Sequence, residues 1–297
     1  MCRALDLQTS VLAKNDATAR TLRAGLAARG TTVVNLLSSP GSGKTALLET
    51  ELRTARERGV PVAALTADLA TENDAERLAR SGVPVKQIHT DGLCHLEAGM
   101  LGGHLVGWLP GDTRLLFVEN VGNLVCPASY DLGESLRVVL ASVTEGEDKP
   151  LKYPTAFGLA NLVLVTKTDI AEAVDFDEDA FRAHVRRVNP GVEIVLTSAR
   201  TGLGAGALLD RALAAAAGEP VHVPVMARQH DGHAHGHDGH GHEHGGHGHG
   251  HDGHAHGHDG HGHEHGGHDH GHDHTHPHPH PHPHVHADAP AHSQLHA

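Results

Sequence analysis

Seven short apolar runs constrain the fold of this chain more than any other feature of its sequence. They read TTVVNLL, VPVAALT, PVKQIHT, RLLFVEN, LRVVLASV, NLVLVTK and VEIVLTS. Segments with helical periodicity separate several of them, such as residues 43–59 and 73–82, and a further helix is predicted over about residues 9–29. Near-continuous apolar strands that alternate with helices predict a mostly parallel sheet covered on both faces, the three-layer α/β architecture.

A glycine-rich turn lies between the first apolar run and the helical segment that follows it. Residues 38–45 read SSPGSGKT, which is the spacing of a P-loop, although Ser38 stands where the general pattern has glycine. In such a loop, backbone N–H groups and the helix N-terminus bind phosphate oxygens, the lysine reaches the β- and γ-phosphates, and the threonine hydroxyl binds Mg²⁺. The sequence therefore predicts a P-loop NTPase. Its phosphate-binding residues are Gly41, Ser42, Gly43, Lys44 and Thr45.

Two later motifs predict which base is bound. LVLVTKTD ends a predicted strand with Thr166, Lys167 and Asp169, close to the Asn/Thr-Lys-x-Asp pattern of GTPases. A carboxylate can accept both the N1–H and the 2-amino protons of guanine, and adenine offers no such pair of donors. Ser198 and Ala199, in TSARTG, resemble the loop that contacts the guanine carbonyl through a backbone N–H. The order of the motifs favours GTP over ATP.

Two acidic residues at predicted strand ends are candidates for catalysis beside Lys44. Asp68 follows the second apolar run, and Glu119 begins a Glu-x-x-Gly sequence in which Gly122 can donate a backbone N–H to the γ-phosphate. Either carboxylate can hold Mg²⁺ directly or through water, or orient the attacking water. For Asp68, a helix cap or a solvated loop position is the alternative.

Two cysteines and a histidine form a candidate metal site. Cys94 and His95 are adjacent, and Cys126 lies seven residues after Glu119. Three nitrogen and sulfur ligands suit Ni²⁺ or Zn²⁺ but are one short of a closed tetrahedral set. We expect Cys94 at a helix N-terminus, where partial positive charge lowers the thiol pKa; two small buried cysteines are the alternative. Because the predicted γ-phosphate loop runs into Cys126, nucleotide state and metal affinity are expected to bias each other.

The composition changes abruptly after Arg228. Of the 33 histidines, 28 lie at or beyond His230, with nine acidic residues and no lysine or arginine, and residues 230–250 recur at 251–271 with one change. Such a segment cannot bury enough apolar surface to order itself, so we predict a folded domain over 1–228 and a metal-binding tail, disordered without metal, over 229–297.

The histidines of this tail are candidate metal ligands, because imidazole binds Ni²⁺, Zn²⁺ and Cu²⁺. The alternatives are a nickel reservoir, a general metal buffer or an inert repeat. The candidate ligands include His233, His235, His237, His240, His242 and His244.

Several classes of partner are not expected. Residues 1–229 carry 23 basic and 27 acidic side chains with no basic run, which argues against nucleic acid. There is no apolar run of membrane-spanning length and no signal-peptide pattern at the N-terminus. We therefore predict a cytoplasmic protein without a membrane partner.

Several stretches together resemble the HypB family of hydrogenase nickel-incorporation GTPases over about residues 10–220. They are LLSSPGSGKTALLE, DLATENDAERL, GLCHLEA, FVENVGNLVCPASYDLGE, VTEGEDKPLKYP and VDFD. The resemblance extends to Ser38, since this family has serine at that position of its P-loop. It implies a SIMIBI-class GTPase that forms a homodimer with GTP, hydrolyses GTP with Mg²⁺, and helps to deliver Ni²⁺ to the [NiFe]-hydrogenase large-subunit precursor with other hydrogenase maturation factors. It also implies that Cys94, His95 and Cys126 form a metal site near the dimer interface, with Lys149 and Lys152 reaching across it.

The sequence departs from this family in two ways. Some relatives have an N-terminal cysteine cluster, whereas only Cys2 stands near the start here, and the histidine-rich segment follows the predicted domain instead of preceding it. Two other functions stay open: a urease accessory GTPase, and a nickel or zinc storage protein with a vestigial nucleotide fold. Hydrolysis is expected to be slow, because no arginine stands out in the P-loop or in a switch segment.

Overall fold

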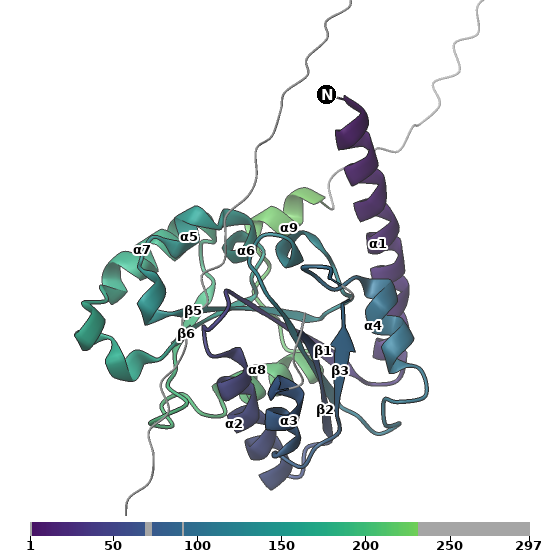
Figure 1. Cartoon of the computed structure of the whole chain (residues 1–297), viewed down its shortest axis with the longest axis horizontal. Coiled ribbons are helices and arrows are strands. Elements are labelled where there is room, and N and C mark those ends of the chain that lie inside the picture. The colour runs from purple at the N-terminus through teal and green to yellow at the C-terminus, as the bar shows by residue number, and fades with distance from the viewer. Residues whose placement is uncertain (1, 69–72, 91, 231–297) are drawn as a thin grey trace, which may run out of the picture. The chain divides into compact units, whose positions relative to one another are not determined.

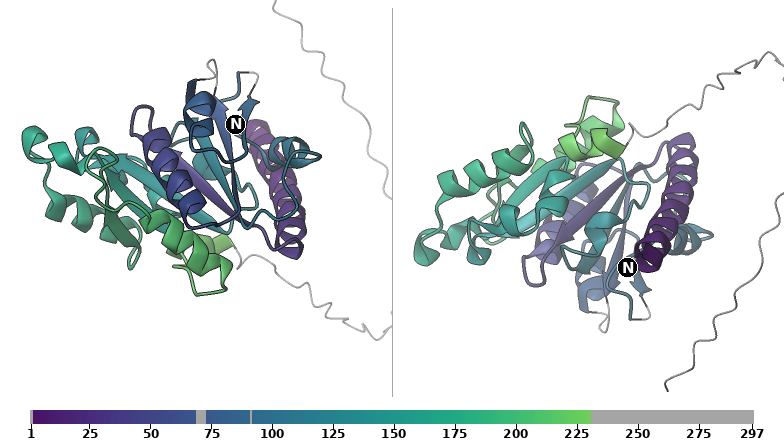
Figure 2. Two further views of the ribbon diagram at one scale, coloured as in Figure 1. Left: turned by 90° about the horizontal axis from the view of Figure 1, so that it is seen from below. Right: turned by 90° about the horizontal axis from the view of Figure 1, so that it is seen from above.

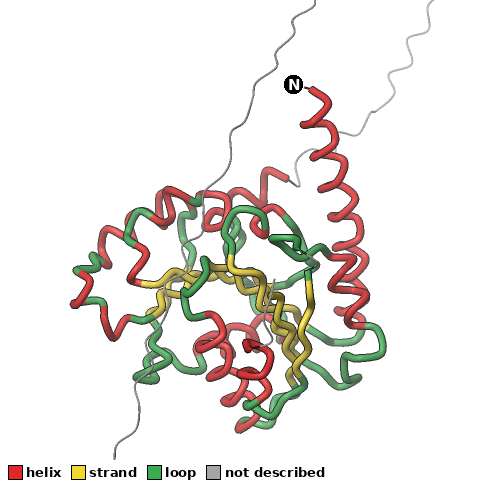
Figure 3. The backbone as a smooth tube through the Cα atoms, viewed as in Figure 1, coloured by secondary structure: helices red, strands yellow, loops and turns green. Residues whose placement is uncertain are grey.

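An all-parallel sheet lies at the centre of the described part of the chain, where the sequence predicts a mostly parallel one. The computed structural model describes residues 2–68, 73–90 and 92–230. Its strands form one twisted sheet (Figures 1 and 3). They are ordered β3-β2-β4-β1-β5-β6-β7, and each overlaps one of the apolar runs. Their bounds are β1 Thr32–Ser38, β2 Val62–Asp68, β3 Val85–His89, β4 Leu115–Gly122, β5 Leu136–Ser142, β6 Leu162–Thr166 and β7 Glu193–Leu196. Every neighbouring pair is parallel.

Helices connect the strands and cover the sheet. The α-helices are α1 Cys2–Ala28, α2 Lys44–Glu57, α3 Asn73–Ala79, α4 Ala98–Leu105, α5 Lys149–Lys152, α6 Pro154–Gly158, α7 Glu178–Val188, α8 Ala207–Ala216 and α9 Val225–His230. Short 3₁₀ helices are η1 Pro127–Ser129, η2 Val143–Glu145, η3 Thr168–Ile170 and η4 Glu172–Val174. The predicted N-terminal helix is confirmed, but it begins at Cys2 rather than near Thr9.

The helices lie on both faces of the sheet, which gives the predicted three layers (Figure 2). Alternation along β1 shows how the sequence makes two cores, because successive side chains of a strand point to opposite faces. Val34 and Leu36 pack in the core under α2, α3 and α8. Val33 packs on the other face with α1 and α4, and Leu37 packs there with α6 and α7.

A buried polar side chain connects two helices on the same face of the sheet. Glu51 of α2 is fully buried and accepts the backbone N–H groups of Gly206 and Leu209, each at 2.9 Å, at the start of α8. Burial raises the pKa of this carboxyl group. The contact satisfies N–H groups that a helix leaves unpaired at its first turn, and it holds α8 against α2.

Two predictions also concern residues outside the described part of the chain. Within the described residues, no helix combines the length and apolar character needed to cross a membrane. The candidate tail ligands His233, His235, His237, His240, His242 and His244 lie outside the described residues, and the domain boundary after Arg228 stays a prediction.

Candidate nucleotide and metal sites

The P-loop lies at the carboxyl end of β1, the edge of a parallel sheet where ligands usually bind. Two of its glycines are required by the backbone: Gly41 has φ 71° and Gly43 has φ 92°, both in the left-handed region that favours glycine. Gly43 is the N-cap of α2, so the helix begins with Lys44. The turn therefore presents the first N–H groups of α2 to the space outside the sheet, as an anion site needs.

A hydrogen bond made by Ser38 accounts for a serine at the position where the general P-loop pattern has glycine. The ammonium group of Lys44, which is only 7% exposed, donates a hydrogen bond of 2.8 Å to the Ser38 hydroxyl. That hydroxyl in turn donates to the carbonyl of Ser39 at 2.7 Å. A glycine could not supply this acceptor. The serine thus anchors the lysine whose remaining donors are expected to reach phosphate.

The end of β4 packs directly against the P-loop. The Thr45 hydroxyl donates to Glu119 Oε1 at 2.7 Å, and the Glu119 side chain is buried. A Cβ on Gly122 would lie 3.1 Å from Pro40 Cα, so only glycine allows this approach without displacement. The structure therefore brings together three of the predicted residues, Thr45, Glu119 and Gly122. Asp68 ends the neighbouring strand β2, but its side chain is outside the described part of the chain, so its roles as Mg²⁺ ligand and catalytic group stay predictions.

The predicted base-reading segment also contacts the P-loop. The Thr166 hydroxyl donates to the Ser42 carbonyl at 2.6 Å. Lys167, in the left-handed region with φ 59°, donates through Nζ to the Gly41 carbonyl at 2.7 Å. These bonds join the carboxyl ends of β6 and β1, so phosphate and base residues line one continuous surface.

Asp169 is held by two side chains from the loop after β7. Ser198 donates to its Oδ1 at 2.5 Å, and Arg200 Nε donates to its Oδ2 at 2.6 Å. These bonds, that of Ser198 first, lower the pKa of the Asp169 carboxyl group. The structure thus places Asp169 next to the Ser198–Ala199 loop, the other part of the predicted base site. Arg200 was missed by the sequence analysis, although it directly follows Ala199.

The predicted phosphate and base residues line two adjoining hollows. One, of about 380 Å³, is lined by base-motif residues including Lys167, Asp169 and Ala199, and the other, of about 460 Å³, is lined by the P-loop, Glu119 and Gly122. Arg77 of α3 lines both, and its Nε is held by Glu49 Oε2 at 2.7 Å. Arg77 was not predicted from the sequence, in which no arginine stands out in the P-loop or in a switch segment.

The predicted cysteine and histidine residues lie near one another, in two segments. The thiols of Cys94 and Cys126 contact each other, and Cys94 Sγ lies 3.7 Å from His95 Nδ1. The prediction that Cys94 starts a helix is wrong: α4 begins at Ala98, after the extended Glu97. Accordingly the pKa of Cys94 is not lowered by a helix; its hydrogen bond with Cys126 and its burial raise the pKa.

The surroundings of His95 fit a metal-binding role. Its ring stacks on Tyr130 with centroids 3.9 Å apart, and its buried Nε2 makes no hydrogen bond, although Glu97 Oε1 lies 3.7 Å away. Two thiols and an imidazole are donors that suit Ni²⁺ and Zn²⁺. Within the described residues, however, no three histidine, cysteine or acidic side chains surround a single ion position. The described part of the chain therefore offers an incomplete ligand set.

The two lysines that the resemblance implies at an interface have partners in their own chain. Lys149 Nζ lies 3.4 Å from Glu145 Oε1 and 4.7 Å from the ring centroid of Tyr153. Glu145 also accepts the Ser42 hydroxyl at 3.2 Å, so Lys149 is linked to the P-loop. Lys152 pairs with Asp148 at 2.8 Å on the surface.

The all-parallel sheet, the left-handed P-loop glycines and the buried lysine define a P-loop nucleotide-binding protein. Residues 32–196 match the family model described as CobW/HypB/UreG, nucleotide-binding domain. The hydrogenase maturation factor HypB of Azotobacter vinelandii is 48% identical over 204 residues, which cover 69% of this chain and 67% of that protein. The chain therefore belongs to the CobW/HypB/UreG family and, within it, to the HypB group.

Solved structures agree with this assignment. The crystal structure of HypB from Archaeoglobus fulgidus has 37% identity and a TM-score of 0.64, and the match covers 69% of this chain and 100% of that one. HypB from Helicobacter pylori, crystallised in complex with nickel, has 39% identity and a TM-score of 0.62, with 67% and 95% covered.

Proposed function

We propose that this chain is a GTP-hydrolysing nickel chaperone for [NiFe]-hydrogenase maturation, in which the GTP state controls nickel binding at Cys94, His95 and Cys126. One observation carries the proposal. Glu119, at the end of β4, contacts Thr45 of the P-loop, and the same peptide reaches the Cys126 thiol seven residues later. A displacement of the Glu119 end of this peptide by a bound triphosphate would be transmitted to a metal ligand. Membership of the HypB group supports the role in maturation.

The nucleotide would be held by groups that already point into the hollows. The ammonium group of Lys44 has three donors, so it can keep its bond to Ser38 while it binds phosphate oxygens. Asp169 would accept the two guanine donors once Arg200, which is 74% exposed, moves off the carboxylate. The backbone N–H of Ala199 would bind the guanine carbonyl. Arg77, held by Glu49, adds positive charge between base and phosphates.

Mg²⁺ fits the position between Thr45 and Glu119, since hydroxyl and carboxylate oxygens are the hard ligands that it prefers. Bound there, it would neutralise charge that develops on the phosphate oxygens. Glu119 or Asp68 would orient the attacking water, while the Gly122 N–H would bind the γ-phosphate. Without a glutamine to orient that water, slow hydrolysis is expected.

Nickel is the proposed cargo, with Zn²⁺ as the alternative ion. The Helicobacter pylori relative crystallised with nickel supports this choice. Because the described residues place no third ligand around a single ion position, we propose that a second copy completes the site, so a GTP-bound homodimer is part of the proposal. Lys149 and Lys152 would face that interface. The tail histidines would serve as an exchangeable nickel reservoir, because imidazole binds Ni²⁺ and the glycine-rich tail sequence has few apolar residues that could build a packed shell around the ligands.

Phosphate release from GTP by the full chain, with ATP as the competing substrate and Lys44→Ala as the inactive control, tests the enzymatic part. We expect slow, Mg²⁺-dependent release from GTP that Lys44→Ala abolishes. Release that is absent under every metal condition would leave the storage function instead. Transfer of nickel from the loaded protein to the hydrogenase large-subunit precursor, compared with transfer to apo-urease, tests the acceptor. Preferential delivery to urease would favour the urease accessory function.

A further inference from the structure

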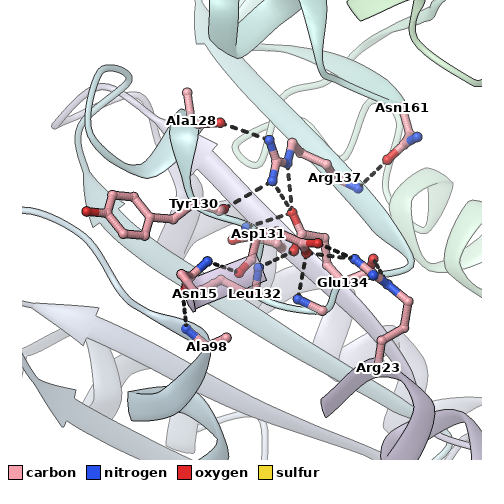
Figure 4. A network of polar contacts seen from close by, with 12 residues as sticks. Asn15, Arg23, Ala98, Ala128, Tyr130, Asp131, Leu132, Glu134, Arg137 and Asn161 are labelled. Carbon is pink, nitrogen blue, oxygen red and sulfur yellow. Dashed lines mark hydrogen bonds and ion pairs between the residues drawn. The ribbon is translucent and has the colours of Figure 1, made fainter. Parts of the chain in front are cut away.

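A polar network inside the protein joins the two segments that carry the metal ligands. Asn15 of α1 is 6% exposed and lies between these segments (Figure 4). Its Nδ2 donates to the Asp131 carbonyl at 2.8 Å, and its Oδ1 accepts the backbone N–H of Ala98 at 2.9 Å. Ala98 is the first residue of α4 and follows Cys94 and His95 closely, while Asp131 follows Cys126 and Tyr130. One amide thus bridges the two halves of the site.

The chemistry of these bonds makes the asparagine specific. The N–H of Ala98 has no acceptor within its own helix, because it belongs to the first turn. The Asp131 carbonyl needs a donor. Only a side chain with one donor and one acceptor at the same reach satisfies both, and a buried amide with both bonds made has a single orientation. Loss of either bond would leave a buried polar group unpaired.

The segment that Asn15 holds on the Cys126 side is rigid for further reasons. Arg137 of β5 donates to the carbonyls of Ala128 at 2.9 Å and Tyr130 at 3.1 Å. Arg23, about two turns further along α1, donates to both carboxylate oxygens of Asp131 at 2.7 and 2.8 Å. Residues 128–131 are therefore fixed to the body of the protein, and the ring of Tyr130 supports His95. Asn15 adds the bond that brings the Cys94–His95 segment to this support.

We propose that Asn15 is a positioning residue for the metal site: through its two hydrogen bonds it holds the Cys94–His95 segment in register with the Cys126–Tyr130 segment, so that both present their ligands to one ion. This inference rests on the proposed metal function of Cys94, His95 and Cys126. Asn15 contacts no ion itself and acts through Ala98 and Asp131. The N-terminal helix α1, which lies beside α4 (Figure 1), thereby has a role in metal affinity.

The test is nickel binding by the full chain, read from the thiolate-to-Ni²⁺ charge-transfer absorption. Imidazole ligands give no such band, so the tail histidines do not contribute to the signal. A chelator buffer sets the free nickel concentration, so uptake by the tail does not distort the titration. Asn15→Ala removes both bonds, and Asn15→Asp keeps an acceptor for Ala98 but loses the donor to Asp131. Thr18→Ala is the matched control, because Thr18 is exposed on the same helix and bonds only to Lys14.

Asn15→Ala and Asn15→Asp are each expected to weaken nickel binding at the thiolate site about tenfold, as loss of a residue that orients metal ligands does. Thr18→Ala should have no effect, and GDP affinity should be unchanged in all three variants. Nickel affinity within twofold of wild type in a folded Asn15 variant would overturn the inference and leave the proposed function intact. A parallel loss of GDP affinity and thermal stability would show a general structural role and also overturn it. If the wild-type protein shows no thiolate band, the proposed metal site fails and this inference fails with it.

Discussion

The buried ion pair between Glu134 and Arg137 should make a large, pH-dependent contribution to stability. Glu134 Oε1 lies 2.7 Å from Arg137, its Oε2 accepts the Leu132 N–H at 2.7 Å, and Asn35 of β1 donates to Oε1 at 3.3 Å. Burial alone would raise the pKa of this carboxyl group, but the Arg137 guanidinium and the N–H donors outweigh it and lower the pKa from 4.5 to about 2. The charged form is therefore favoured by the fold.

The magnitude follows from that difference. Each unit by which a pKa falls on folding corresponds to about 1.4 kcal/mol, so Glu134 contributes about 3 kcal/mol when ionised. Removing one partner of a buried ion pair by mutation costs about 3–5 kcal/mol, which agrees with this contribution of Glu134. Because the folded pKa is the lower one, this stability is present in full above pH 4.5 and is lost as the pH falls toward 2.

Glu134→Gln should thus lower the free energy of unfolding by about 3 kcal/mol at pH 7. Urea denaturation followed by the fluorescence of Trp108, the single tryptophan, measures it. The difference from wild type should shrink below pH 4.5 by about 1.4 kcal/mol per pH unit. Glu178→Gln is the control, since its i,i+4 pair with Arg182 is partly exposed to solvent and is expected to contribute less than about 0.5 kcal/mol. A loss below about 1 kcal/mol for Glu134→Gln, or a difference that is the same at pH 7 and pH 3.5, would contradict a stabilising role of the ionised Glu134.

Three further predictions concern the ligands. Lys44→Ala should weaken binding of a fluorescent GTP analogue by about 100-fold, because charge-assisted bonds to phosphate are lost; unchanged affinity would mean that phosphate binds elsewhere. Asp169→Asn should shift preference from GTP toward XTP in a competition assay, because the amide N–H₂ opposes the guanine amino group but suits the xanthine carbonyl; an unchanged ratio would exclude Asp169 from base reading. Nickel uptake by the full chain in equilibrium dialysis should fall as the pH drops through about 6.5, because protons compete for the tail imidazoles; equal loading at pH 7.5 and 5.5 would contradict this.

The fold and the nucleotide residues could be predicted because their signals are local. An apolar run indicates a strand, and the glycine spacing of residues 38–45 indicates a phosphate-binding loop. The role of Ser38 was not visible in this way. It depends on the lysine six positions later folding back onto the strand end, which is a property of the turn in three dimensions.

Residues that act across the fold escaped the sequence analysis for the same reason. Asn15 contacts Asp131 more than 100 positions away, and Arg77 reaches the hollows only because α3 lies beside α2. The wrong expectation for the thiol of Cys94 came from placing the start of α4 too early. Residues before Ala98 turn without forming a helix, so the neighbour that sets the Cys94 pKa is Cys126 and not a helix terminus.

Nickel affinity at the thiolate site, measured with each of two nucleotides bound, shows whether the nucleotide and metal sites are coupled. The full chain is titrated at buffered free nickel, first with GDP and then with a non-hydrolysable GTP analogue, and the thiolate charge-transfer band is followed. Since the Glu119–Cys126 peptide contacts both sites, the two dissociation constants should differ at least about fivefold, and nickel should change the affinity for the analogue, relative to GDP, by the same factor. Equal nickel affinities with both nucleotides would contradict the coupling of the two sites.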